Sequence, residues 1–234
     1  MELHVGTSGY SYKEWKGRFY PADLKEAGML RFYAERFPTV EINNTFYRMP
    51  SPELLARWEA EVPAGFRFVL KAPRRITHEK RLSDVADTVA RLLEVSSGLG
   101  DKRGPFLFQL PPYFKKDAAR LRGFLGLLPR GVRAAFEFRD PSWEDGEVSD
   151  TLREAGAALC LADTDESETP PRPVPTAGWG YLRLRRADYD EAALRAWAGR
   201  IRDQPWTEAY VFFKHEDEGR GPELARRLRD VLQG

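Results

Sequence analysis

Charged and amide side chains recur along short apolar runs that are typical of β-strands. Glu41 and Asn43 alternate along one run, Glu137 and Arg139 along another, and Arg183 lies in a third with the same alternation. Successive side chains of a strand point to opposite faces, so each set shares one face. Burying such charges is costly unless they pair or bind a ligand. The pattern therefore predicts a site in which carboxylates work beside cations.

The chemistry that this pattern predicts is acid–base catalysis on a bound anion. Arginine and lysine bind phosphate or carboxylate groups, and a carboxylate beside arginine keeps a low pKa, which suits a base. We predict Glu137 and Glu41 as candidate catalytic bases and His78 as the acid. The predicted ligand-binding residues are Thr7, Ser8, Tyr10, Trp15, Asn43, Tyr47, Lys71, Gln109, Arg139, Trp143 and Arg183.

Eight strand-like runs must position these side chains. They span residues 3–7, 40–43, 66–71, 106–110, 132–138, 157–162, 180–184 and 208–213. Amphipathic helical stretches are predicted at residues 30–37, 54–62, 83–93, 121–128, 148–155, 194–201 and 224–232. Strands separated by helices pair in parallel, and eight such units predict an α/β fold, a closed (β/α)8 TIM-like barrel. An open doubly wound sheet is disfavoured, because no Gly-x-Gly-x-x-Gly turn follows the first strand.

The unit after the sixth strand is irregular. Four prolines among residues 170–175 leave no room for a helix, so we predict a proline-rich loop in its place. Residues 163–178 would form either a surface connector or a lid over the barrel mouth. Helices and strands continue on both sides, so we expect a single domain over residues 1–234. In such barrels catalytic groups lie at the carboxyl ends of the strands, where the polar residues listed above fall.

The first loop after residues 3–7 is rich in aromatic residues, namely Tyr10, Tyr12, Trp15, Phe19 and Tyr20. Aromatic rings beside cations suit a sugar ring or a base. Packed against one another, the same rings would form a small core that holds the loop in place. The sequence leaves both interpretations open.

Composition excludes several classes of protein. Lysine and arginine number 37 against 36 acidic residues, a net charge of +1, which argues against a general polyanion binder. No apolar run approaches the roughly 20 residues of a membrane span, and no leader is visible, so we expect a cytoplasmic protein without a membrane partner. The single Cys160 is predicted to be a buried structural thiol. Asparagine occurs only at positions 43 and 44, a composition typical of a GC-rich genome or a thermophile.

Several segments of the chain resemble the YecE-like family (domain of unknown function 72). They are residues 6–15 with 19–21, 40–48, 66–78, 104–112, and 137–139 with 142–143. The resemblance implies a TIM-barrel-like fold over nearly the whole chain and no established reaction. This chain departs from the family at two places. Family members tend to have His-Gly after the seventh strand, where this chain has Arg185-Arg186. An asparagine-rich segment is common near the eighth strand, where this chain has residues 213–217. The resemblance therefore carries no ligand role onto these strands except at Arg183.

These observations favour an enzyme, a hydrolase, lyase or isomerase, that binds a small anionic, ring-containing ligand such as a sugar phosphate or nucleotide at the barrel mouth. A glycosidase with Glu41 and Glu137 as its carboxylate pair is a weaker interpretation. No cofactor is predicted.

Two alternatives stay open. One is a metal-assisted phosphodiester hydrolase with a divalent metal on Glu41, His78, Glu137, Asp163 and His215. The other is a nucleic-acid-binding barrel without catalysis, in which aromatic residues stack on bases.

Overall fold

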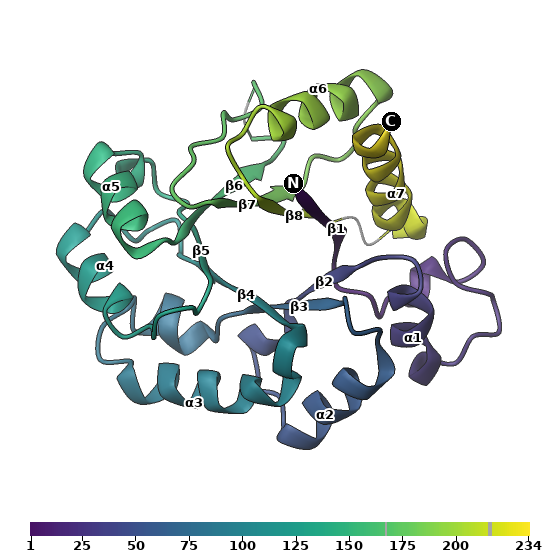
Figure 1. The fold of residues 1–234 in the computed structure, drawn as a ribbon, viewed down its shortest axis with the longest axis horizontal. Helices are drawn as coiled ribbons and strands as arrows, with labels where there is room; N and C mark the ends of the chain where they lie inside the picture. Colours follow the sequence, from purple (N-terminus) through teal and green to yellow (C-terminus); the bar gives the residue numbers. More distant parts are fainter. Residues whose placement is uncertain (167, 215–216) are drawn as a thin grey trace.

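Eight parallel strands close into a barrel in the computed structural model, which describes residues 1–166, 168–214 and 217–234. The strands are β1 (Glu2–Ser8), β2 (Thr39–Ile42), β3 (Arg67–Lys71), β4 (Arg103–Gln109), β5 (Ala134–Glu137), β6 (Ala158–Asp163), β7 (Trp179–Leu184) and β8 (Glu208–Phe213). Each pairs with its neighbours in sequence, and β8 pairs back onto β1, from Glu2 opposite Glu208 to Thr7 opposite Phe213. The predicted (β/α)8 barrel is confirmed (Figure 1).

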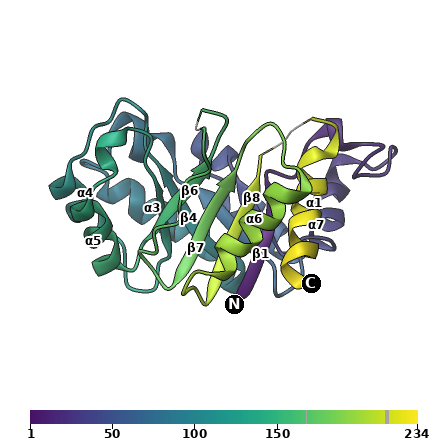
Figure 2. The same cartoon turned by 90° about the horizontal axis from the view of Figure 1, so that it is seen from above.

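Within the described residues, seven α-helices surround the ring of strands (Figure 1). They are α1 (Met29–Ala34), α2 (Pro52–Glu61), α3 (Ala86–Ser96), α4 (Ala118–Leu125), α5 (Gly146–Ala155), α6 (Glu191–Arg202) and α7 (Arg220–Gln233). Both chain ends lie at the lower rim in Figure 2, where the strands begin. We call this rim the base, and the rim at the carboxyl ends of the strands the mouth.

Local sequence signals explain where several helices begin and end. The Ser51 side chain accepts a hydrogen bond from the Leu54 amide at 3.3 Å, and Asp190 accepts one from Ala193 at 2.7 Å, so both act as N-caps. Gly156 ends α5 in the left-handed conformation, with φ 63°. The helix expected from residue 83 begins only at Ala86, because Asp84 has a φ of 50°, which is incompatible with a right-handed helix.

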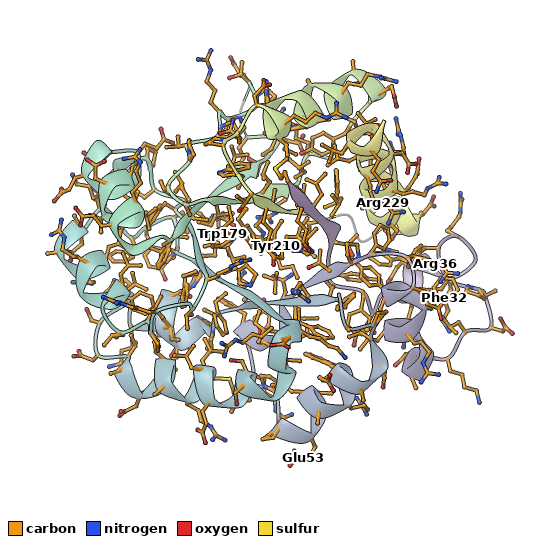
Figure 3. The ribbon with its side chains drawn as sticks, viewed as in Figure 1. Phe32, Arg36, Glu53, Trp179, Tyr210 and Arg229 are labelled. Atoms are coloured by element: carbon orange, nitrogen blue, oxygen red, sulfur yellow. The ribbon has the colours of Figure 1, made fainter. Side chains whose placement is uncertain are left out.

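Two apolar layers hold the barrel together. The larger lies between strands and helices, and the smaller fills the barrel interior with Val69, Leu107, Ala135, Ala158, Cys160, Trp179, Tyr181, Tyr210 and Phe212. Trp179 and Tyr210 lie inside the ring of strands in Figure 3. The alternation of the strands produces this division, because inward and outward side chains follow one another along each strand. The barrel interior is therefore filled by packed apolar side chains, which we call the apolar plug, and the polar mouth lies directly above them.

The connection between β6 and β7 contains no helix among its described residues, as the prolines predict. Its buried Thr176 side chain accepts a hydrogen bond from the Leu159 amide at 2.7 Å and donates one to the Ala157 carbonyl at 2.8 Å. Pro171 and Val174 line a cleft with residues of β6. The two hydrogen bonds hold Thr176 beside the start of β6, and the connector and the lid both stay predictions for residues 163–178. Ser167, within the segment considered as a lid, lies outside the described residues.

No helix in the described part of the chain is both long enough and apolar enough to cross a membrane.

Gly6 allows β1 to approach β2 closely, so its substitution tests how tightly the barrel closes. A Cβ atom there would lie 2.2 Å from the Thr39 carbonyl oxygen and 2.9 Å from the Tyr33 hydroxyl. We expect Gly6→Ala to lower the free energy of unfolding by about 2 kcal/mol, measured by urea denaturation. Gly199→Ala in α6 is the control: its Cβ meets nothing within 4 Å, so the change should be neutral or stabilise by up to about 1 kcal/mol. Equal stability of the two variants would contradict this packing.

Candidate functional site

The Arg183 guanidinium lies between two buried carboxylates at the mouth. Its NH1 atom is 2.6 Å from Glu137 Oε2, and its NH2 atom is 2.9 Å from Glu41 Oε1. Arg183 and Glu137 are each 2% exposed, and Glu41 is fully buried. The strand alternation therefore correctly predicted that these three side chains point inward and converge. They come from β7, β2 and β5.

Glu41 accepts hydrogen bonds from four side chains. Ser8 Oγ donates at 2.6 Å, the Tyr181 hydroxyl at 2.6 Å and Asn43 Nδ2 at 3.2 Å, in addition to Arg183. Burial opposes ionisation of Glu41, but the charge of Arg183 and the hydrogen bonds from Ser8 and Tyr181 outweigh it and lower its pKa to about 2. Glu41 is thus a permanently ionised, enclosed anchor for Arg183.

Glu137 connects the buried layer to the outer part of the mouth. Gln109 Nε2 donates to Glu137 Oε1 at 2.7 Å, and Gln109 Oε1 accepts from Lys71 Nζ at 2.7 Å. Burial opposes the ionisation of Glu137, whereas the charge of Arg183 and hydrogen bonds from Arg183 and Gln109 prevail and lower its pKa. Cys160 Sγ lies 4.0 Å from Glu137 Oε2. Burial and then the charge of Glu137 raise the pKa of this thiol, consistent with the structural role predicted for Cys160.

Three further cations belong to the mouth. Burial, followed by the charge of Arg183, lowers the pKa of Lys71 to about 8. Arg185 NH1 lies 4.0 Å from Glu137 Oε1, and burial together with the charge of Arg183 lowers the pKa of Arg185. Arg139 is exposed, and its charge contributes to the lowered pKa values of Arg185 and His78. Positive charge is therefore concentrated around the two carboxylates.

His78 lies on the same rim, in a π-helical turn over Arg75–Glu79. Its Nδ1 atom is 2.9 Å from Thr77 Oγ1, and its ring centroid is 4.9 Å from that of Phe46. Partial burial and the charges of Lys71, Arg74 and Arg139 lower the pKa of His78 to about 4. At neutral pH this imidazole is uncharged, so it is a poorer acid than the sequence interpretation required.

An aromatic edge borders Lys71. Lys71 Nζ lies 4.4 Å from the centroid of the Phe46 ring, and Phe46 packs edge-on against Tyr47 at 5.0 Å. Tyr47 is 81% exposed. The turn Asn44–Phe46 is held beside β3 because Thr45 Oγ1 donates to the Lys71 carbonyl at 2.7 Å. The sequence analysis selected Tyr47 but missed Phe46. The signal that could have found Phe46 is its position beside Tyr47 in the run that follows β2.

Four predicted ligand-binding residues lie away from the interior of the mouth. Thr7 points outward and pairs with the Tyr33 hydroxyl at 2.9 Å, because Ser8 occupies the inward position of β1. Trp15 is 1% exposed and packs against Tyr12, Phe19 and Tyr20, so the first loop is a small aromatic core. Tyr10 packs near Tyr33 at 6.2 Å. Trp143 is 3% exposed, stacks on Phe138 at 4.4 Å and donates to the Phe114 carbonyl.

Two charged residues also differ from the sequence expectation. Arg139 does not continue the inward face of Glu137, because β5 ends at Glu137 and the alternation ends with it. Asp163 points outward from β6, where it accepts hydrogen bonds from Arg186 Nε at 2.7 Å, the Tyr189 hydroxyl at 2.9 Å and Trp197 Nε1 at 3.1 Å. It fastens the β7–α6 connection and does not face the rim cations.

The strands part beside Glu137. β5 and β6 pair only at Ala135 with Ala158 and at Phe136 with Leu159. Above these pairs, a surface cleft of about 610 Å³ is lined by Arg139, Cys160 and Arg172, among other residues. Cys160 lines this cleft and its Sγ atom also lies 4.0 Å from Glu137 Oε2, whereas Glu137 itself is not among the lining residues.

The described members of the proposed metal-ligand set do not form a cluster at the mouth. Arg183 bonds to both Glu41 and Glu137, and Asp163 faces outward; His215 lies outside the described residues. In the part of the chain that the structure describes, the group of three potential metal ligands within 4.8 Å of one another lies at the base. It consists of Glu2, His4 and Glu208, and Glu208 also pairs with Arg133.

Sequence comparison identifies the family. The profile of the family described as "Protein of unknown function DUF72" matches residues 4–234. The chain belongs to the DUF72 family. Two curated relatives are UPF0759 protein YecE of Escherichia coli K12, 26% identical over 99% of this chain and 93% of the relative, and UPF0759 protein YunF of Bacillus subtilis, 22% identical over 98% and 94%.

Solved structures of DUF72 proteins share the barrel. A DUF72 protein of Thermotoga maritima superposes with a TM-score of 0.82 at 25% identity, covering both chains fully. One from Enterococcus faecalis gives 0.80 at 21% identity, covering 99% of this chain and 96% of the other. These likenesses support the YecE-like resemblance inferred from the sequence. The description of the family names no reaction.

Removing the central cation should destabilise the fold. Arg183→Met leaves two buried carboxylates without their shared partner, and we expect the free energy of unfolding to fall by about 3–5 kcal/mol. Urea denaturation measures the effect. Arg91→Met is the control, because Arg91 and Glu94 form an exposed pair at 2.9 Å that contributes about 1 kcal/mol or less. A loss at Arg183 no larger than that at Arg91 would contradict the central role of this ion pair.

The lowered pKa of Glu41 predicts acid sensitivity. Its folded pKa of about 2 lies below the ordinary 4.5, so its contribution to stability is complete above pH 4.5 and is lost as the pH falls toward 2. Between pH 7 and pH 3 this group alone should account for about 2 kcal/mol of lost stability. Glu41→Gln, whatever its starting stability, should lose correspondingly less over this range. Equal losses in the variant and the parent protein, measured by urea denaturation, would refute the assignment.

Proposed function

We propose that the DUF72 barrel mouth binds a small anionic, ring-containing molecule and acts on it as an enzyme. The observation that carries the proposal is the charge of the mouth. Among the described residues, Arg183, Lys71 and Arg185 surround Glu41 and Glu137 with an excess of one positive charge, and the exposed Arg139 at the rim raises this excess to two. An anion with two negative charges, such as a phosphate ester, balances this excess.

The cations divide into two sets with different tasks. Arg183 is occupied by two carboxylates and holds them in position, so it contributes mainly to the geometry of the site. Lys71, Arg185 and Arg139 are more accessible; Arg185 lies 4.0 Å from Glu137, and Lys71 is joined to Glu137 through Gln109. Arg183 Nε is buried without a hydrogen-bond partner among the described residues, which leaves one donor in the buried layer.

The ring of the ligand finds apolar surface at the same rim. Phe46 and the exposed Tyr47 form an edge beside Lys71, which suits the face of a sugar or a base. A cleft of about 610 Å³ that Arg139 lines lies next to this rim. With a net charge of only +1 on the whole chain, a small ligand fits better than a long polyanion.

Glu137 is the better general base of the two carboxylates. It stays ionised at neutral pH and is joined through Gln109 to Lys71, whereas Glu41 is enclosed by four donors. The acid assigned to His78 is better supplied by Lys71, because an ammonium group with a pKa of about 8 donates a proton readily near neutrality. Such a pair suits a lyase, an isomerase or a hydrolase.

Phosphate binding tests the proposal directly. Isothermal titration calorimetry of the protein with inorganic phosphate at pH 7 and low salt should detect binding. We expect Arg185→Met to weaken it at least about tenfold, the effect of one lost charge-assisted hydrogen bond. The control Arg91→Met removes an exposed cation of α3 and should leave the affinity unchanged. Undetectable binding in the parent protein, or equal affinities in all three, would overturn the proposal.

A further inference from the structure

We propose that Lys71 is a nucleophile that condenses with the carbonyl carbon of an anionic aldehyde or ketone. The inference rests on the proposed function, because the same cationic mouth must hold the anionic group of that molecule. It goes further by assigning a substrate class and a covalent step to one amine.

The immediate neighbours of Lys71 Nζ are a neutral amide and an aromatic ring. Its Nζ atom donates to the neutral Gln109 Oε1 at 2.7 Å and lies 4.4 Å from the centroid of the Phe46 ring. Within the described residues, no carboxylate lies close enough to form an ion pair with it. The side chain is half-buried at the carboxyl end of β3.

Charged groups from three other strands face this amine. Arg183 and Arg185 of the β7 segment disfavour its protonated form, and Glu41 of β2 and Glu137 of β5 favour it; burial and the arginines prevail. With a pKa of about 8, roughly one molecule in ten carries the free amine at pH 7, against fewer than one in a thousand at the ordinary 10.5. Desolvation and neighbouring cations are the means by which enzymes activate Schiff-base lysines.

The covalent step requires only the amine and the carbonyl compound. The Nζ lone pair forms a bond to the carbonyl carbon, and the carbonyl π pair moves to oxygen. A proton moves from nitrogen to that oxygen, which gives a carbinolamine. A proton from solvent then converts the hydroxyl into water, which leaves as the nitrogen lone pair forms the C=N bond. The resulting iminium returns its N–H proton to solvent to give the imine. No oxidant or reductant takes part in this condensation.

Pyridoxal 5′-phosphate serves as the probe, since it combines an aldehyde, a ring and a phosphate. The full-length protein is treated with a limiting amount at pH 7, and sodium borohydride then reduces any imine to a stable secondary amine. Peptide mass mapping measures the modification of each lysine. We expect Lys71 to be modified at least about tenfold faster than the exposed Lys25, with inorganic phosphate slowing the reaction at Lys71.

Absorbance of the imine before reduction gives a second measurement. It should form equally in the parent protein and in K116R, which removes an amine paired with Asp145, and it should be strongly reduced in K71R. Modification of Lys71 no faster than that of Lys25, or equal imine absorbance in K71R, would overturn the inference. The phosphate titration of the unmodified protein is independent of these readouts. Phosphate binding without preferential modification therefore refutes the covalent step and leaves the anion site standing.

Discussion

One arginine shared by two buried carboxylates is the interaction on which the mouth depends. Arg183 joins β7 to β2 through Glu41 and to β5 through Glu137, and these attractions act above an apolar plug where water does not screen them. Ser8 and Gln109 extend the network to β1 and β4. Because breaking a buried pair leaves an uncompensated charge, this layer imposes one arrangement on the carboxyl ends of five strands.

In that arrangement the carboxylate charges are fully paired, whereas part of the positive charge is available to a ligand. The carboxylates are held by hydrogen bonds and remain ionised, whereas Lys71 and Arg185 retain positive charge that the carboxylates do not fully balance. A site with preorganised charge of one sign binds the opposite sign without rearrangement. The same imbalance lowers the pKa of Lys71, so anion binding and the reactivity of the amine have one physical origin.

Eight strand-like runs separated by helical stretches were enough to predict the barrel. The alternation of residues along each strand predicted the convergence of Glu41, Glu137 and Arg183, because alternation is fixed by strand geometry. It failed for Arg139, which lies beyond the end of β5. Composition could not distinguish the aromatic core around Trp15 from a ligand-stacking surface, because both require several aromatic residues in one loop. The contribution of Arg185 depends on its distance from Glu137 and so required the structure.

The central claim is that uncompensated positive charge at the mouth is relieved by an anion. Side-chain ¹⁵N NMR of the Lys71 ammonium, followed across pH with and without inorganic phosphate, tests it most directly. The account predicts a pKa of about 8 in the free protein and a clear rise toward the ordinary 10.5 when phosphate is bound. A Lys71 pKa that is already ordinary without phosphate, or one that saturating phosphate leaves unchanged, would contradict the account.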